Sequence, residues 1–251
     1  MNRTIALLTA CALPALACRG KEPSGFIAFQ LSAQPPGRPA LDSAKVVVAL
    51  GKDTVFVYRV RIVLMELAIA PSLANECEEE EGEDNPPCVE FDEHPVVIDL
   101  PLGRPVVPRS TKPAPATSYN LFQAIIHRPT PEADTALLQA NPEFQGKSIL
   151  AEGIWSRGGK RVPFAFASDF TEQEEISLEP ALAVSKGDSL AVTLRVDVAS
   201  WFKSEDGKSL VDPRTAGLGG PNEHLLRDHI RTSIKVFRDQ NRDGQDDDSR
   251  P

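Results

Sequence analysis

The chain has 251 residues, of which 41% are hydrophobic and 25% are charged, as in a globular protein that buries a core. Its formal net charge of −9 repels phosphate backbones, so we expect no binding to nucleic acid. The 22 prolines argue against long helices.

The N-terminus has the pattern of a secretion signal. Arg3 precedes an apolar stretch over residues 5–17 that is too short to span a bilayer. The stretch ends in Ala15-Leu16-Ala17-Cys18, which resembles the lipobox of bacterial lipoproteins. That resemblance implies that Cys18 carries a lipid anchor and becomes the first residue of the mature protein.

The same resemblance divides the start of the chain into a signal peptide over residues 1–17 and a tether over residues 18–24. It implies a place in the bacterial cell envelope, where Arg19 after the cysteine favours the outer membrane of a Gram-negative host. Two alternatives stay open. A rival box ends at Cys11, and a simple secretory peptide would make Cys18 incidental.

Two further cysteines, Cys77 and Cys88, bracket an acidic stretch that includes residues 78–81, all glutamate. In an oxidising compartment this spacing predicts a disulfide that closes an exposed loop. Such a bond contributes about 2–3 kcal/mol through chain entropy. The acidic run itself is interpreted as a solvated loop.

Alternation of apolar and polar residues dominates the chain from residue 25 to residue 237 and predicts strands. Gly158-Gly159 predicts a tight hairpin turn between two of them, because glycine adopts a positive φ readily. The expected strands are Gly25–Ala33, Lys45–Leu50, Val55–Ala70 (one bent strand or two), Val89–Leu100, Tyr119–His127, Ile149–Ser156, Lys160–Ala167, Glu174–Leu182, Leu190–Val198 and Arg231–Phe237. This order predicts an all-β protein, an antiparallel β-sandwich over residues 25–237.

Two short helical insertions are expected in the sandwich. Thr130–Ala140 begins with a Thr-Pro-Glu start signal, and Asn222–Arg231 begins with a capping residue. Gly103–Thr117, rich in proline, and Lys203–Pro221, rich in glycine and aspartate, are expected to be long loops.

The acidic tail over residues 238–251 has the spacing of a calcium-binding loop. Residues that offer oxygen atoms occupy positions one, three, five, seven and nine of that loop: Asp239, Asn241, Asp243, Gln245 (through its carbonyl) and Asp247. Gly244 stands at position six, where the loop turns sharply. Calcium is therefore the cofactor that the sequence predicts.

The tail resembles an EF-hand loop and, more closely, the thrombospondin type-3 calcium repeats of secreted proteins. It departs from both at position twelve, where Arg250 replaces the expected acid. The affinity expected of such an incomplete shell is weak, about 10⁻⁴–10⁻³ M. The alternative is an acidic, disordered tail that solubilises the last strand.

A second resemblance lies in the strand order. Val96-Val97-Ile98-Asp99-Leu100 and Pro115-Ala116-Thr117-Ser118-Tyr119 follow the long Val55–Ala70 segment, and a later strand ends near Trp201. This order resembles uncharacterised bacterial lipoprotein domains with a transthyretin- or immunoglobulin-like sandwich. The resemblance implies a fold but provides no catalytic residue.

No familiar catalytic motif occurs in the chain, so we predict a non-catalytic lipoprotein that binds calcium or a cell-envelope protein or glycan. One alternative is a carbohydrate-binding or adhesion module, which requires Trp155 and Trp201 to be exposed on one face. The other is a hydrolase with an unrecognised site, which requires a concave pocket with converging polar groups. Glu152, Asp169 and Asp197 are carboxylates of the kind that glycoside hydrolysis uses in pairs, but nothing in the sequence fixes their separation. The four histidines, His94, His127, His224 and His229, lack metal-binding spacing and are expected at the surface or at strand ends.

Overall fold

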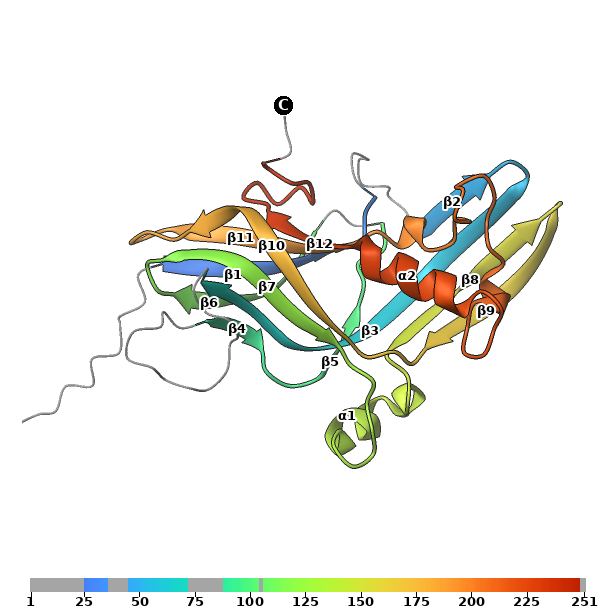
Figure 1. Ribbon diagram of the computed structural model, residues 1–251, viewed down its shortest axis with the longest axis horizontal. Coiled ribbons are helices and arrows are strands. Elements are labelled where there is room, and N and C mark those ends of the chain that lie inside the picture. Colours follow the sequence, from blue (N-terminus) through green and yellow to red (C-terminus); the bar gives the residue numbers. More distant parts are fainter. Residues whose placement is uncertain (1–24, 36–44, 72–87, 104–105, 249–251) are drawn as a thin grey trace, which may run out of the picture.

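A computed structural model describes residues 25–35, 45–71, 88–103 and 106–248 (Figure 1). The strands are β1 (Gly25–Ser32), β2 (Val46–Leu50), β3 (Asp53–Pro71), β4 (Val89–Asp92), β5 (Val96–Asp99), β6 (Val107–Ala114), β7 (Ser118–Ile126), β8 (Ile149–Arg157), β9 (Lys160–Ser168), β10 (Glu172–Ala183), β11 (Ser189–Val196) and β12 (Ile234–Arg238). The helices are α1 (Thr135–Ala140) and α2 (Glu223–Ser233), with 3₁₀ turns η1 (Pro142–Phe144), η2 (Val198–Ser200) and η3 (Pro213–Thr215). The protein is mostly β, in two sheets, as the sequence predicts.

The long strand β3 is the common element of the larger sheet. One of its edges pairs in turn with β2, β5 and β4, and its other edge pairs first with β8 and then with β7. Between these pairings the strand bends at Glu66, whose φ of 55° is unusual for a residue with a side chain. The bend divides the molecule into two parts that bury their inner faces differently (Figure 1).

We call the first part the sandwich half: the end of β3 from Leu67 onward with β4, β7 and β10, packed against the four-stranded sheet β12-β11-β1-β6. Phe29 of β1 fills the space between the layers, stacking on Phe91 and Phe122 with ring centroids 4.9 and 6.0 Å apart. β1 pairs with β11 in parallel, an exception in a mostly antiparallel fold. The core of this half is therefore a true sheet-on-sheet interface.

We call the second part the open half: the start of β3 with β2, β8 and β9. The irregular segment from Val198 to Pro221, rather than a sheet, covers its inner face, with η2 on β2 and η3 on β9, and α2 packs in turn on η2 (Figure 1). Trp201 and Phe202 are fully buried there, and Phe202 meets Phe164 of β9 edge to face at 5.8 Å. This cover depends on a few large anchoring side chains.

The predicted hairpin turn at Gly158-Gly159 is confirmed, and the predicted strand Tyr119–His127 corresponds to β7. The β8–β9 hairpin turns at Gly158 and Gly159, which have φ values of 56° and 82°. Tyr119, the last residue of the Pro115–Tyr119 segment, is buried, and its hydroxyl donates to the Pro115 carbonyl at 3.2 Å. Burial raises the pKa of Tyr119 to about 12. The segment therefore fixes the corner through which the chain enters β7.

Three other predictions need correction. The expected loop Gly103–Thr117 contains β6, whose Pro108 and Pro113 are tolerated because β6 pairs on one edge only, with β1. The expected helix Thr130–Ala140 begins only at Thr135, because the Asp134 carboxylate accepts from the Thr130 backbone N–H at 2.7 Å and holds residues 130–134 in a turn. The predicted strand Val89–Leu100 is interrupted, forming β4 and β5.

Candidate functional site

The C-terminal loop follows β12 directly and folds back against β11. The backbone N–H of Asp239 donates to the Ala191 carbonyl at 3.0 Å, which extends the strand pairing by one residue. The chain then turns at Arg242 and Gly244, with φ values of 59° and 76°. Glycine suits the second turn, as expected for position six of the loop. Figure 1 shows this loop beside the four-stranded sheet, at the C-terminal end of the chain.

The Asp239 carboxylate holds the loop to the sheet. Its Oδ2 accepts from the Thr193 hydroxyl at 2.8 Å and from the Gly244 N–H at 3.0 Å, while its Oδ1 accepts from the Asp243 N–H at 3.0 Å. The residue is fully buried, and burial raises the pKa of its carboxyl. Among the described residues no Lys or Arg forms an ion pair with it, so its negative charge is stabilised by hydrogen bonds alone.

The other predicted ligands lie on the same loop. Asn241 Oδ1 accepts from the Asp243 N–H at 3.1 Å, and Asp243 Oδ1 accepts from the Gln245 N–H at 2.9 Å. Asp247 Oδ2 accepts from the Gln240 N–H at 2.6 Å. Residues 239–248 are thus an ordered series of side-chain-stabilised turns, so the alternative of a disordered tail is wrong for this stretch.

Two residues that sequence reasoning missed complete the attachment. Gln240 spans to β11, where its Oε1 accepts from the Ala191 N–H at 3.2 Å and its Nε2 donates to the Ser189 carbonyl at 2.7 Å. Thr193 lies on the outward side of β11 yet is fully buried. The sequence carried no signal for its burial, because alternation predicts a solvent-exposed polar residue at this outward position.

The fit of the loop to calcium is partial. The types of residue, their spacing and the sharp turn at Gly244 suit a hard cation. Within the described part of the chain, however, no group of three or more Asp, Glu, His or Cys side chains converges as a metal centre does. Calcium binding would therefore have to draw the carboxylates of Asp243 and Asp247 together rather than meet a preformed cage.

Comparisons with known protein families, with curated proteins and with solved structures gave no match. The lipoprotein and calcium-repeat resemblances therefore stay predictions.

Of the remaining predicted residues, Cys18 and Cys77 lie outside the described residues. Cys88 lies immediately before β4. The disulfide and the lipid anchor thus stay predictions. No helix in the described ranges is both long enough and apolar enough to pass through a bilayer.

The tryptophan platform required by the carbohydrate-binding alternative does not form. Trp155 is 2% exposed and Trp201 is fully buried, because both face the core of the open half. The Trp201 indole N–H donates to the Ser233 hydroxyl at 2.9 Å, which satisfies its one polar atom inside the protein. Both side chains are core residues.

The three candidate catalytic carboxylates occupy separate positions with structural contacts. Glu152 is exposed on β8, opposite Arg59 of β3. Asp169 lies 3.4 Å from the Arg128 guanidinium, and Asp197 caps η2 by accepting from the Ala199 N–H at 3.1 Å. Nothing in these contacts pairs two of them across a substrate site.

Two histidines also make structural contacts. His127 Nε2 lies 3.0 Å from Asp134 Oδ2, and His229 Nδ1 lies 3.0 Å from the Trp201 carbonyl oxygen. The first contact links the end of β7 to the residue before α1, and the second links α2 to the backbone of the buried Trp201.

Proposed function

We propose that this protein is a non-catalytic β-sandwich lipoprotein of the bacterial cell envelope whose C-terminal loop binds calcium. The envelope assignment is supported by the leader-like residues 1–17 and by Cys18, which lies shortly before the first described strand. The calcium assignment is supported by the loop over residues 239–248.

The burial of Asp239 is the observation that carries the calcium proposal. A carboxylate that is fully buried without a cationic partner is costly, and a divalent cation beside it offsets that cost. Its bonds from the N–H groups of Asp243 and Gly244 also close the loop around the carboxylate. The residues that would hold the ion are Asp239, Asn241, Asp243, Asp247 and the carbonyl of Gln245.

Titration calorimetry tests this proposal. The protein would be prepared from Arg19 onward, which retains every described residue, and titrated with calcium. We expect one saturable site with a dissociation constant of about 10⁻⁴–10⁻³ M. Asp243→Ala combined with Asp247→Ala should abolish the heats while leaving the Asp239 anchor in place. Flat heats for the unmodified protein at millimolar calcium would refute the site.

A matched control is available in another acidic turn. Asp206 accepts from the Ser204 hydroxyl at 2.7 Å and from the Lys208 N–H at 3.0 Å, but it belongs to an exposed loop without the alternating oxygen series. Asp206→Ala should leave the calcium heats unchanged. Equal loss in this variant would mean that the heats report nonspecific counter-ion binding.

Metabolic labelling with a radioactive fatty acid tests the anchor. In a bacterial host the full chain should take up label, Cys18→Ser should lose it, and Cys11→Ser should retain it. The reverse pattern would assign the anchor to the rival site, and an unlabelled full chain would leave only a secreted protein.

A further inference from the structure

The outer face of the open half carries an apolar row across four strands. The hydrogen-bonded register aligns Val47 of β2 with Phe56 of β3, Phe56 with Ile154 of β8, and Ile154 with Pro163 of β9. All four alternate with core residues such as Val55, Val57 and Trp155, so they point away from the interior. Each of them is at least partly exposed.

This row departs from the usual arrangement of a one-sided sheet, in which outward positions are polar. Tyr58, next to it on β3, is 46% exposed at a bulge in the β3–β8 pairing. Ala49 and Ala165 extend the apolar surface on either side. The elements that cover this half, η2 and η3 with α2 packed on η2, lie on its opposite, inner side. Contiguous apolar surface of this kind marks an interaction site.

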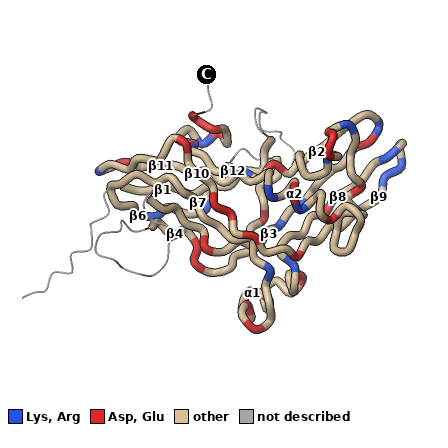
Figure 2. Tube along the Cα trace, viewed as in Figure 1, with Lys and Arg blue, Asp and Glu red and all other residues tan. Residues whose placement is uncertain are grey.

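The rim of the row is cationic. The ammonium of Lys45 and the guanidinium of Arg161 lie 5.7 and 5.4 Å from the centre of the Phe56 ring. Neither makes an ion pair with an acid in the described ranges. Figure 2 shows the basic residues at the tip of the β8–β9 hairpin, which contains Arg157, Lys160 and Arg161. Arg157 is paired with Asp53 at 3.8 Å, so Lys45 and Arg161 carry the positive charge of the rim on a chain with a net charge of −9.

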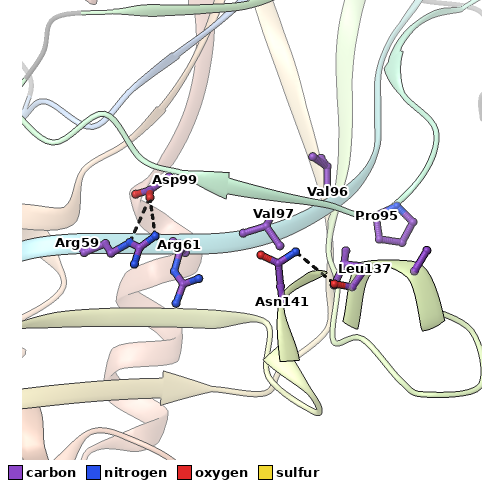
Figure 3. A pocket seen from close by; sticks show the side chains of 9 residues that line it. Arg59, Arg61, Pro95, Val96, Val97, Asp99, Leu137 and Asn141 are labelled. Carbon is purple, nitrogen blue, oxygen red and sulfur yellow. Dashed lines mark hydrogen bonds and ion pairs between the residues drawn. The ribbon is translucent and has the colours of Figure 1, made fainter. Parts of the chain in front are cut away.

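A hollow of about 570 Å³ continues the face toward α1 (Figure 3). Val97 and Leu137 line it together with Arg59 and Arg61. Arg59 is paired with Asp99 at 3.2 Å, and Arg61 is paired with Glu143, so the charges of this hollow are already balanced. Charged and apolar side chains line it together, and none of the four row residues is among them.

These features restrict the occupant. A second copy would bring the same two cations with Glu152 as the acid beside them, so it supplies less negative charge than an acidic segment does. A polyphosphate chain would meet an apolar row with Glu152 beside it and no series of cations to follow. An acidic polypeptide with apolar side chains satisfies both the row and its rim. Exposed Tyr, Phe and Arg side chains are also the residues that dominate protein interfaces.

We propose that the outer face of the open half docks an acidic segment of a partner protein. Apolar side chains of the segment pack along Val47, Phe56, Ile154 and Pro163, and its carboxylates pair with Lys45 and Arg161. The site lies on the larger sheet, whereas the C-terminal loop lies on the smaller one, so the proposal stands independently of calcium and of the lipid anchor.

Selection from a random peptide library displayed on phage tests the proposal. The protein from Arg19 onward would be immobilised, and the selected peptides would be synthesised and their affinities measured. We expect sequences that combine Asp or Glu with aliphatic or aromatic residues. Arg161→Glu and Tyr58→Ala should each weaken binding about tenfold or more, and added salt should weaken it further.

The chain offers matched controls on the other sheet. Phe26 is 52% exposed and Lys235 is exposed, both outside the open half. Phe26→Ala and Lys235→Glu should leave peptide affinity unchanged, and circular dichroism should confirm that all four variants are folded.

Three results would overturn the proposal. The first is selection of peptides without acidic residues. The second is equal loss of affinity in the Phe26 and Lys235 controls. The third is binding to vesicles of phosphatidylcholine and phosphatidylglycerol, lost in Arg161→Glu, with no peptide selected, which would assign the face to an anionic membrane instead.

Discussion

The inner faces at the two ends of β3 are buried by different kinds of structure. In the sandwich half, the inner face of the sheet meets a second sheet whose backbone groups are paired along whole strands. In the open half, an irregular segment covers this face, and its polar groups are satisfied individually, for example by the Val211 N–H donating to the Phe202 carbonyl at 2.9 Å. A sheet distributes stability over many equivalent bonds, whereas an irregular cover concentrates it in a few anchors.

Removing the main anchor should have the largest effect. Trp201→Ala deletes a fully buried ring and its hydrogen bond to Ser233, so we expect it to lower the free energy of unfolding by about 4–5 kcal/mol. Hydrogen exchange should show lost protection in α2 before any loss in β1 and β11. Uniform loss of protection through both halves would mean that the two covers unfold as one unit.

Phe29→Ala is the counterpart in the sandwich half. The ring is fully buried and stacks on two other rings, so a loss of about 3–5 kcal/mol is expected here as well. This variant should loosen β1, β4 and β7 together, because three strands share the vacated space. Urea denaturation of both variants side by side gives the comparison.

A smaller effect is expected from the bulge that shapes the open half. A Cβ on Gly153 would lie 2.0 Å from the Phe56 carbonyl oxygen and 2.6 Å from the Phe164 ring. Backbone cannot move aside cheaply, so Gly153→Ala should cost about 3 kcal/mol by thermal or urea denaturation. The neighbouring, outward-facing Glu152→Ala should change stability by no more than about 0.5 kcal/mol. Similar losses of stability in Gly153→Ala and Glu152→Ala would argue against the close approach of Gly153 to Phe56 and Phe164.

The sandwich half should respond to pH through Asp239. Burial raises the pKa of this carboxyl, so the folded protein binds its proton more tightly than the unfolded chain does. Its contribution to stability is therefore fully present below the ordinary pKa of 3.8 and is lost as pH rises through the raised value. In metal-free buffer, the wild type should lose stability relative to Asp239→Asn over that range.

Calcium should flatten or reverse that trend, because the ion binds the ionised carboxylate. The measurement is a series of urea titrations of both proteins from pH 4 to pH 7, with and without calcium. If the difference in unfolding free energy between the two proteins does not vary with pH, the titration of the Asp239 carboxyl is contradicted.

The smallest effect on stability is expected in the segment between β7 and β8 that contains α1 and η1. Arg61 stacks on Phe144 at 5.0 Å and pairs with Glu143, and this hydrogen bond is the main cause of a lowered pKa of the Glu143 carboxyl. Because the Glu143 side chain is 40% exposed, Glu143→Gln should cost less than about 1 kcal/mol. That contribution is present above the ordinary pKa of 4.5 and is lost as pH falls through the lowered value. A cost of several kcal/mol in thermal denaturation at pH 7 would show a tighter attachment.

Elements that depend on a few neighbouring residues could be predicted from the sequence, whereas the pairing of distant strands could not. Strict alternation located β11, and Gly158-Gly159 located the β8–β9 turn, because both signals are contained in a few neighbouring residues. The proline-rich β6 was missed because proline is acceptable only at an edge, and edge position depends on a partner, β1, from the start of the chain.

The candidate site shows the same division. Spacing alone located Asp239, Asn241 and Asp243 on one loop. That Asp239 would be buried against Thr193 followed from where β11 lies relative to β12, which no local pattern encodes. The outer row of the open half was likewise invisible, because its four residues come from four strands.

The inner position of β1 governs when the protein can finish folding. Its parallel partners, Ser189 to Arg195, are synthesised near the end of the chain, and β12 follows later still. The β8–β9 hairpin closes between adjacent residues and forms early, whereas the smaller sheet waits for nearly the whole polypeptide. Until then β1, which carries Ile27, Phe29 and Leu31, can pair with β6 on one edge, but its other edge stays unpaired. Any truncation that removes β11 leaves that strand as a seed for aggregation.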